Sequence, residues 1–169
     1  AGAHLCALVL LRGAVHWRPT DLRGFVGISG PYHVPATAAH WGARGFGQAM
    51  LDFIFGDEAG MLMASPSYLA ARAEDVELPP MLLLHGTADK SATAQSTLDF
   101  AAALEDLGVD VHTKLYEGWT HTDPILERPF AGDQRLHRDL LEAVSKWCDG
   151  PVASFSDETP GLGRLCPQV

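Results

Sequence analysis

The chain has 169 residues, of which 47% are hydrophobic, and its formal net charge at pH 7 is −9. This length and hydrophobic content suit one packed domain and exclude an intrinsically disordered chain. The acidic charge and the lack of any run of Lys and Arg argue against nucleic-acid binding, which needs clustered positive charge over the phosphates.

The first half of the chain predicts a helix, a strand and a less regular segment. Residues 1–11 are dense in Ala and Leu and predict a buried helix, in which Cys6 is a small core residue. Residues 22–29 form an apolar run that predicts a buried strand, because the letters SGP end it with a turn signal. Residues 32–79 show one predicted helix, at 47–55, and no strand pattern, so we expect an insertion between two strands.

The second half alternates strands and helices. The run PMLLLHG at 80–86 predicts a buried strand, and 91–107 predicts an amphipathic helix that ends at a glycine. Residues 109–116 alternate as a half-exposed strand does, and 134–149 predict a second amphipathic helix. Residues 150–169 are rich in Pro, Gly and Ser, and we expect a mobile tail there.

This order of elements predicts an α/β fold with a parallel sheet and flanking helices. Short right-handed crossovers would place the strands 80–86 and 109–116 side by side. Ligands of such sheets bind outside the carboxyl ends of the strands. The loops that follow these two strands, HGTAD at 85–89 and EGWTH at 117–121, are therefore expected at the functional edge.

Asp89 and His121 end these two loops, and their order fits the acid and base of a Ser-Asp-His triad. Asp89 would accept a hydrogen bond from one nitrogen of His121, and the other nitrogen would take the proton of a nucleophile. Taken alone, Asp89 could equally be a turn former or helix cap, and His121 a solvated loop residue. His85 is expected to support the turn that leads to Asp89.

The nucleophile of such a triad is not in the sequence, because no G-x-S-x-G pentapeptide occurs in it. Ser29 ends a predicted strand, but a loop and not a helix follows. The chain opens with AGAHL and continues as a helix, which is how an elbow written G-x-S-A-G continues after its serine. We therefore expect the serine directly before Ala1, with Gly2 as the last glycine of the elbow.

Several segments resemble the isoprenylcysteine methylesterases, which are α/β-hydrolases of the carboxylesterase and hormone-sensitive-lipase-like group. The resemblance extends over residues 1–148, and it is carried by the segments FVGISGPY, SPSYL, PPMLLLHGTADKSA and LYEGWTHTDPIL. It implies a partial α/β-hydrolase domain at 1–149, with a cap over the active site at about 32–79. The HGTAD loop alone is shared by many esterases and peptidases.

The resemblance also implies the roles of the site residues. It places the acid at Asp89, the base at His121 and one oxyanion donor, a backbone N–H, at Ala1. It makes Trp119 and Tyr32 candidates for substrate binding. Other cap aromatics could line a prenyl pocket or simply pack in the core: Trp41, Phe46, Phe53 and Phe55.

The activity implied is hydrolysis of a carboxyl methyl ester on a prenylated cysteine, with a small ester or a prenylated-protein C-terminus as substrate. No cofactor or metal is implied. The resemblance indicates endoplasmic reticulum and Golgi membranes, reached through a segment upstream of Ala1, with the cytoplasm as the alternative. Without its serine, the 169-residue chain alone is expected to be inactive.

Other functions remain open from the sequence. A serine peptidase or an arylformamidase of the same fold would share the HGTAD loop. A non-catalytic homologue acting as a binding module would carry a residue other than Ser before Ala1. A rearranged or spliced product that lacks the first half of the fold by design is a further alternative.

Overall fold

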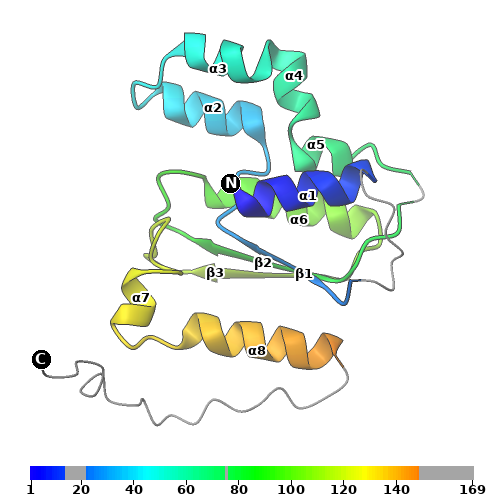
Figure 1. The fold of residues 1–169 in the computed structure, drawn as a ribbon, viewed down its shortest axis with the longest axis vertical. Coiled ribbons are helices and arrows are strands. Elements are labelled where there is room, and N and C mark those ends of the chain that lie inside the picture. Colours follow the sequence, from blue (N-terminus) through cyan, green and yellow to red (C-terminus); the bar gives the residue numbers. More distant parts are fainter. Residues whose placement is uncertain (14–21, 75, 149–169) are drawn as a thin grey trace, which may run out of the picture.

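The computed structural model describes residues 1–13, 22–74 and 76–148, and it contains a three-stranded sheet between two layers of helices (Figure 1). The strands are β1 (Phe25–Ile28), β2 (Met81–Gly86) and β3 (Val111–Tyr116). They are parallel and follow the order β1-β2-β3. The parallel sheet and the adjacency of the two later strands confirm the fold predicted from the sequence.

β2 lies at the centre of the sheet, and all six of its residues are buried. Its side chains alternate between two cores, as the two-residue period of a strand requires. Met81 and Leu83 belong to one cluster, and Leu82 and Leu84 to the other. A strand that is buried on both faces needs a continuous apolar run, and this run is the reason why β2 could be predicted from the sequence.

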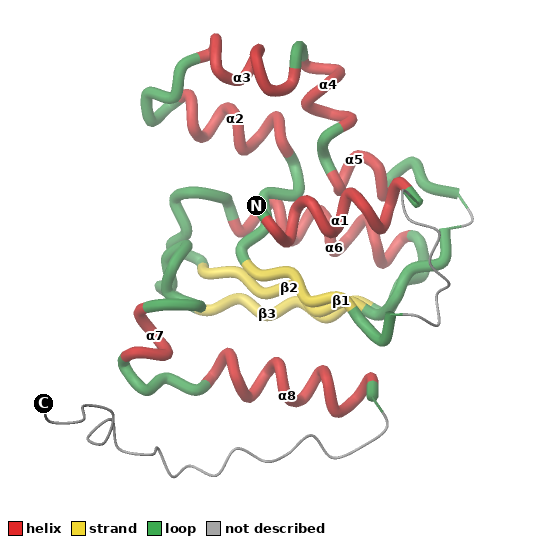
Figure 2. The backbone as a smooth tube through the Cα atoms, in the orientation of Figure 1, coloured by secondary structure: helices red, strands yellow, loops and turns green. Residues whose placement is uncertain are grey.

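The two helical layers cover opposite faces of the sheet, as Figure 2 shows. α1 (Gly2–Arg12), α5 (Pro66–Ala70) and α6 (Ala94–Asp106) lie on one face, and α8 (Arg135–Trp147) lies on the other. The larger core is formed where α1, α5 and α6 meet the sheet. Its fully buried members are Ala7, Tyr32, Ala70, Met81, Leu83, Phe100 and Leu104.

α1 buries less of itself than the sequence suggested. Ala7 and Leu10 face the core, whereas Leu5 is 57% exposed and Cys6 is exposed. The prediction that Cys6 is a core residue is therefore wrong for this structure. The helix presents one face to the sheet, and Leu5 and Cys6 lie outside that face.

The described residues between β1 and β2 form four helices: α2 (Val34–Gly42), α3 (Gln48–Phe55), α4 (Glu58–Met63) and α5. The first three form a lobe beyond α1, with a small core of its own around Val34, Leu51 and Met61 (Figure 1). α3 had been predicted, but α2, α4 and α5 had not. Two of them begin at side-chain caps: Nδ1 of His33 accepts from the N–H of Ala36 at 3.2 Å in α2, and the Asp57 carboxylate accepts from the N–H of Gly60 at 2.8 Å in α4.

The short helix α7 (Glu127–Phe130) was also not predicted. The predicted tail at 150–169 lies outside the described residues. Of the helices in the described residues, none has the length and apolar character needed to cross a membrane.

Candidate active site

Asp89 and His121 meet at the carboxyl ends of the neighbouring strands β2 and β3. The Nδ1 atom of His121 lies 2.7 Å from Oδ2 of Asp89. A carboxylate can only accept, so Nδ1 carries the hydrogen and donates it. The neutral imidazole then has a free lone pair on Nε2, which is the atom that a general base uses.

Asp89 is held from both of its oxygens, and its side chain is fully buried. Oδ1 accepts from the backbone N–H groups of Ser91 at 2.7 Å and Ala92 at 3.0 Å. Burial works against the charged form, but hydrogen bonds from His85, Ala92, His121 and Ser91 hold the pKa of Asp89 well below its usual range. The carboxylate is therefore ionised, as a partner for an imidazolium must be.

The loop that follows β2 (residues 87–93, the acid loop) and the loop that follows β3 (residues 117–126, the histidine loop) are joined by hydrogen bonds. The N–H of Thr87 donates to Tyr116 at 3.0 Å, and that of Ala88 to Trp119 at 2.9 Å. The Thr87 hydroxyl accepts from the N–H of Gly118 at 2.8 Å. This close approach needs Gly86, because a Cβ there would lie 2.7 Å from the carbonyl carbon of Trp119.

A second carboxylate, that of Asp123, holds the histidine loop through hydrogen bonds. Asp123 accepts from the N–H of Thr120 at 2.6 Å and from Nε of Arg128 at 2.8 Å. These bonds, led by the one from Thr120, lower the pKa of Asp123. Sequence reasoning missed this pair, although the spacing D-x-x-x-x-R directly after His121 was visible.

A cavity of about 270 Å³ opens beside His121. The imidazole is 38% exposed, so its ring is accessible. Most of the wall is apolar or aromatic, and it comes from α1, the lobe helices and the acid loop. The lining residues are Ala1, His4, Pro31, Val34, Thr37, Trp41, Phe55, Ser91, Ala92 and His121.

Two of these lining residues are fixed by hydrogen bonds that cross between elements. The indole N–H of Trp41 donates to the carbonyl of Ser91 at 2.7 Å, which ties α2 to the acid loop. His4 bonds the carbonyl of Ala64 through Nε2 at 2.7 Å. Burial lowers the pKa of His4, so this imidazole favours the neutral form at pH 7.

The two aromatic residues predicted to bind substrate are both fully buried. Tyr32 stacks on Phe100 with ring centroids 4.5 Å apart, and Trp119 stacks on Tyr116 at 4.1 Å. Neither is among the residues that line the cavity, so a substrate-binding role for Tyr32 and Trp119 stays a prediction. Trp41 and Phe55, from helices α2 and α3 of the lobe, line the cavity instead.

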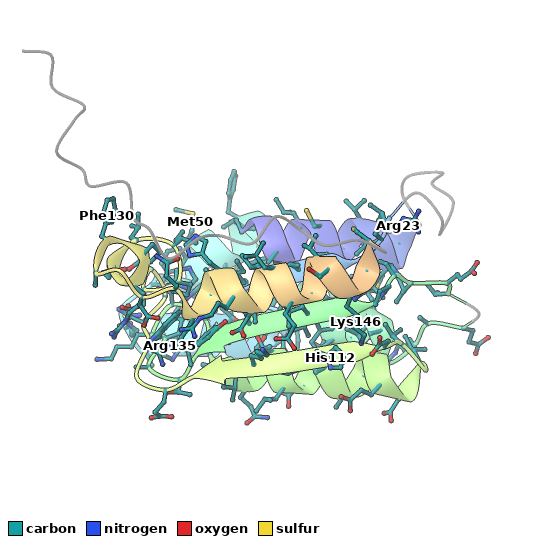
Figure 3. All side chains as sticks on the ribbon, turned by 90° about the horizontal axis from the view of Figure 1, so that it is seen from below. Arg23, Met50, His112, Phe130, Arg135 and Lys146 are labelled. Atoms are coloured by element: carbon teal, nitrogen blue, oxygen red, sulfur yellow. The ribbon has the colours of Figure 1, made fainter. Side chains whose placement is uncertain are left out.

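Two aromatic residues of the predicted cap and two further histidines lie outside the site. Phe53 is 87% exposed, and Phe46 is 43% exposed. His33 caps α2, and His112 lies beside Lys146 at the far end of β3 (Figure 3). In the part of the chain that the structure describes, no group of three or more His, Cys, Asp or Glu is arranged to hold a metal ion.

Two curated relatives are similar in sequence to most of this chain. An isoprenylcysteine alpha-carbonyl methylesterase of Arabidopsis thaliana is 28% identical over an alignment of 182 positions, which covers 100% of this chain and 42% of that protein. A protein of Oryza sativa subsp. japonica, named as a probable enzyme of this kind, is 31% identical over 85% of this chain and 38% of its own length. The chain thus spans less than half the length of these curated relatives.

The fold is similar to that of solved hydrolases. An acylaminoacyl peptidase of Pyrococcus horikoshii superposes with a TM-score of 0.63 at 19% identity, covering 93% of this chain and 24% of that one. Esterase 2 of Thermogutta terrifontis superposes at 0.58 with 23% identity, covering 86% of this chain and 50% of that one. The fold is therefore that of an α/β-hydrolase. Residues 42–151, more than half of the sequence, match the model of the prolyl oligopeptidase family, and the chain belongs to this family.

Proposed function

We propose that the chain supplies the acid and the base of a serine ester hydrolase, in a longer protein that carries a serine directly before Ala1. The observation that carries this proposal is the 2.7 Å contact between His121 Nδ1 and Asp89 Oδ2 at the rim of a cavity that Ala1 also lines. The serine would then stand at the N-terminal end of α1, close to the imidazole.

In this mechanism, Nε2 of His121 takes the proton of the serine hydroxyl as the oxygen attacks the ester carbonyl. The ionised Asp89 stabilises the resulting imidazolium. The backbone N–H that residue 1 would have in the longer protein, together with the positive end of α1, would stabilise the oxyanion. His121 then gives its proton to the leaving alkoxide, and a water molecule repeats the sequence on the acyl-enzyme.

The substrate that we propose is a carboxyl methyl ester of a prenylated cysteine. The names of the curated relatives support this choice, and so does the apolar cavity wall beside His121. Trp41 and Phe55 would contact the apolar part of the substrate. The second candidate is hydrolysis of an amide or peptide bond, which is favoured by the family match.

Kinetics on the serine-containing protein separate these candidates. We expect hydrolysis of a prenylcysteine methyl ester with a higher kcat/KM than that of an acyl-amino-acid amide, and loss of both in His121→Ala. A higher kcat/KM for the amide than for the ester would support the second candidate, hydrolysis of an amide or peptide bond. Activity that survives in His121→Ala, or a residue other than serine before Ala1, would contradict the proposed triad.

A further inference from the structure

His85 is a buried titratable residue that the mechanism above does not use. It is the fifth residue of β2, and its side chain is fully buried. Its Nδ1 lies 2.6 Å from the hydroxyl of Thr97 on α6. Its Nε2 lies 3.1 Å from the carbonyl of Ala92 and 3.1 Å from Oδ2 of Asp89.

These neighbours determine which nitrogen carries the hydrogen. The carbonyl of Ala92 and the carboxylate of Asp89 can only accept, so Nε2 of His85 carries the hydrogen that faces them. The Thr97 hydroxyl can donate, and it therefore pairs with Nδ1 as the acceptor. The ring is then satisfied on both sides as a neutral imidazole with its hydrogen on Nε2, as a buried polar group needs to be.

We propose that His85 is a positioning residue for the catalytic acid, and this inference rests on the proposed function. Nδ1 of His121 donates to Oδ2 of Asp89, and Nε2 of His85, which also bonds the carbonyl of Ala92, lies 3.1 Å from the same oxygen. Two backbone N–H groups occupy the other oxygen. The donor from His85 leaves Oδ2 little freedom to rotate away from His121.

The consequence for catalysis is geometric. The direction of His121 Nε2 toward the serine depends on the hydrogen bond at Nδ1, and that bond depends on where Oδ2 points. Without the donor from His85, the buried carboxylate would lose one partner and its orientation would loosen. Turnover would fall because the base would be misaligned, whereas substrate binding in the cavity would change little.

The test uses three variants of the serine-containing protein. His85→Leu removes the donor but fills the space. His85→Gln keeps an N–H near the position of Nε2. Ser67→Ala is the control, because it removes a different buried hydrogen bond, from the Ser67 hydroxyl to the carbonyl of Tyr32 at 2.9 Å.

The readouts are kcat, KM and the low-field proton resonance of the His121 Nδ1–H group. In His85→Leu we expect kcat to fall roughly tenfold or more, KM to change less than about twofold, and the resonance to shift or broaden. His85→Gln should restore most of both signals. An unchanged kcat and resonance in His85→Leu would overturn the inference, and so would an equal loss of kcat in Ser67→Ala.

Two further outcomes keep the test decisive. If the parent protein hydrolyses no ester, the proposed function fails, but the resonance still reports whether His85 holds the Asp89–His121 contact. If His85→Leu does not fold, Thr97→Val provides the second variant, because it keeps the ring and removes the donor to Nδ1. We expect a few-fold loss of kcat there, and wild-type values of kcat and of the resonance would overturn the inference.

Discussion

Replacing Gly86 by Ala should separate the two loops that carry Asp89 and His121. The new Cβ would lie 2.7 Å from the carbonyl carbon of Trp119, against about 3.5 Å for an ordinary carbon–carbon contact. The obstacle is backbone and cannot rotate away, so the loops must move apart by about 1 Å. Overpacking of this kind costs about 1–3 kcal/mol of the free energy of unfolding. A displacement of 1 Å at a catalytic group costs roughly 100-fold in rate.

Urea denaturation measures the first effect, and ester hydrolysis by the longer, serine-containing protein that we propose measures the second. Gly42→Ala is the control, because a Cβ at this last residue of α2 would meet nothing within 4 Å. We expect the control to be neutral or slightly more stable, since Ala favours a helix over Gly. A Gly86→Ala variant with the stability and kcat of the parent would refute the close approach of the two loops.

Three further predictions concern the surroundings of the pair. Asp123→Asn removes the charge that pairs with Arg128 and weakens the hydrogen bonds that hold the histidine loop. We therefore expect kcat to fall several-fold with KM unchanged. A change in KM alone would indicate that Asp123 contacts the substrate instead. Trp41→Phe removes the donor to Ser91 but keeps a ring in the cavity, so the melting temperature should drop by about 2–4 °C and KM should change less than in Trp41→Ala. Because the pKa of Asp89 is lowered by folding, its contribution to stability is complete above its unfolded pKa of about 4 and is lost as the pH falls toward its folded pKa. Acid titration of the unfolding free energy below about pH 4 should therefore be shallower in Asp89→Asn than in the parent, and equal slopes would contradict the lowered pKa.

The sequence predicted the parts of this fold that depend on local pattern. The apolar run of β2 is typical of a buried strand, and the apolar stripe of α8 predicts a helix that packs on the sheet with one face. Topology then followed, because parallel strands joined by one helix are neighbours with their carboxyl ends at the same edge. The proximity of Asp89 and His121 could be predicted because it needs no more than this.

The orientation of single aromatic residues could not be predicted in the same way. Trp119 is two residues from His121, yet it is closed in by Tyr116 on β3 and by the guanidinium of Arg135, 4.9 Å from its ring. Figure 3 shows Arg135 at the end of the molecule near Phe130, where α7 and α8 meet. The partners of Trp119 on α8 come more than ten residues later in the chain, so no local pattern could indicate that its ring turns inward. The same holds for Trp41, whose partner Ser91 lies on another element.

From the sequence, Asp89 could be a turn former or a catalytic acid. The structure shows that it can be both, because each of its carboxylate oxygens has a different set of partners. Oδ1 closes the turn onto Ser91 and Ala92, which is what a residue before a helix does. The turn fixes the carboxylate plane, and Oδ2 is thereby left to receive the imidazoles of His85 and His121. An acid that stands on a flexible loop would have to be ordered at each turnover, whereas this one is ordered by the turn over Ser91 and Ala92, just before α6. The structural role of Asp89 is thus the physical reason why it can align a base.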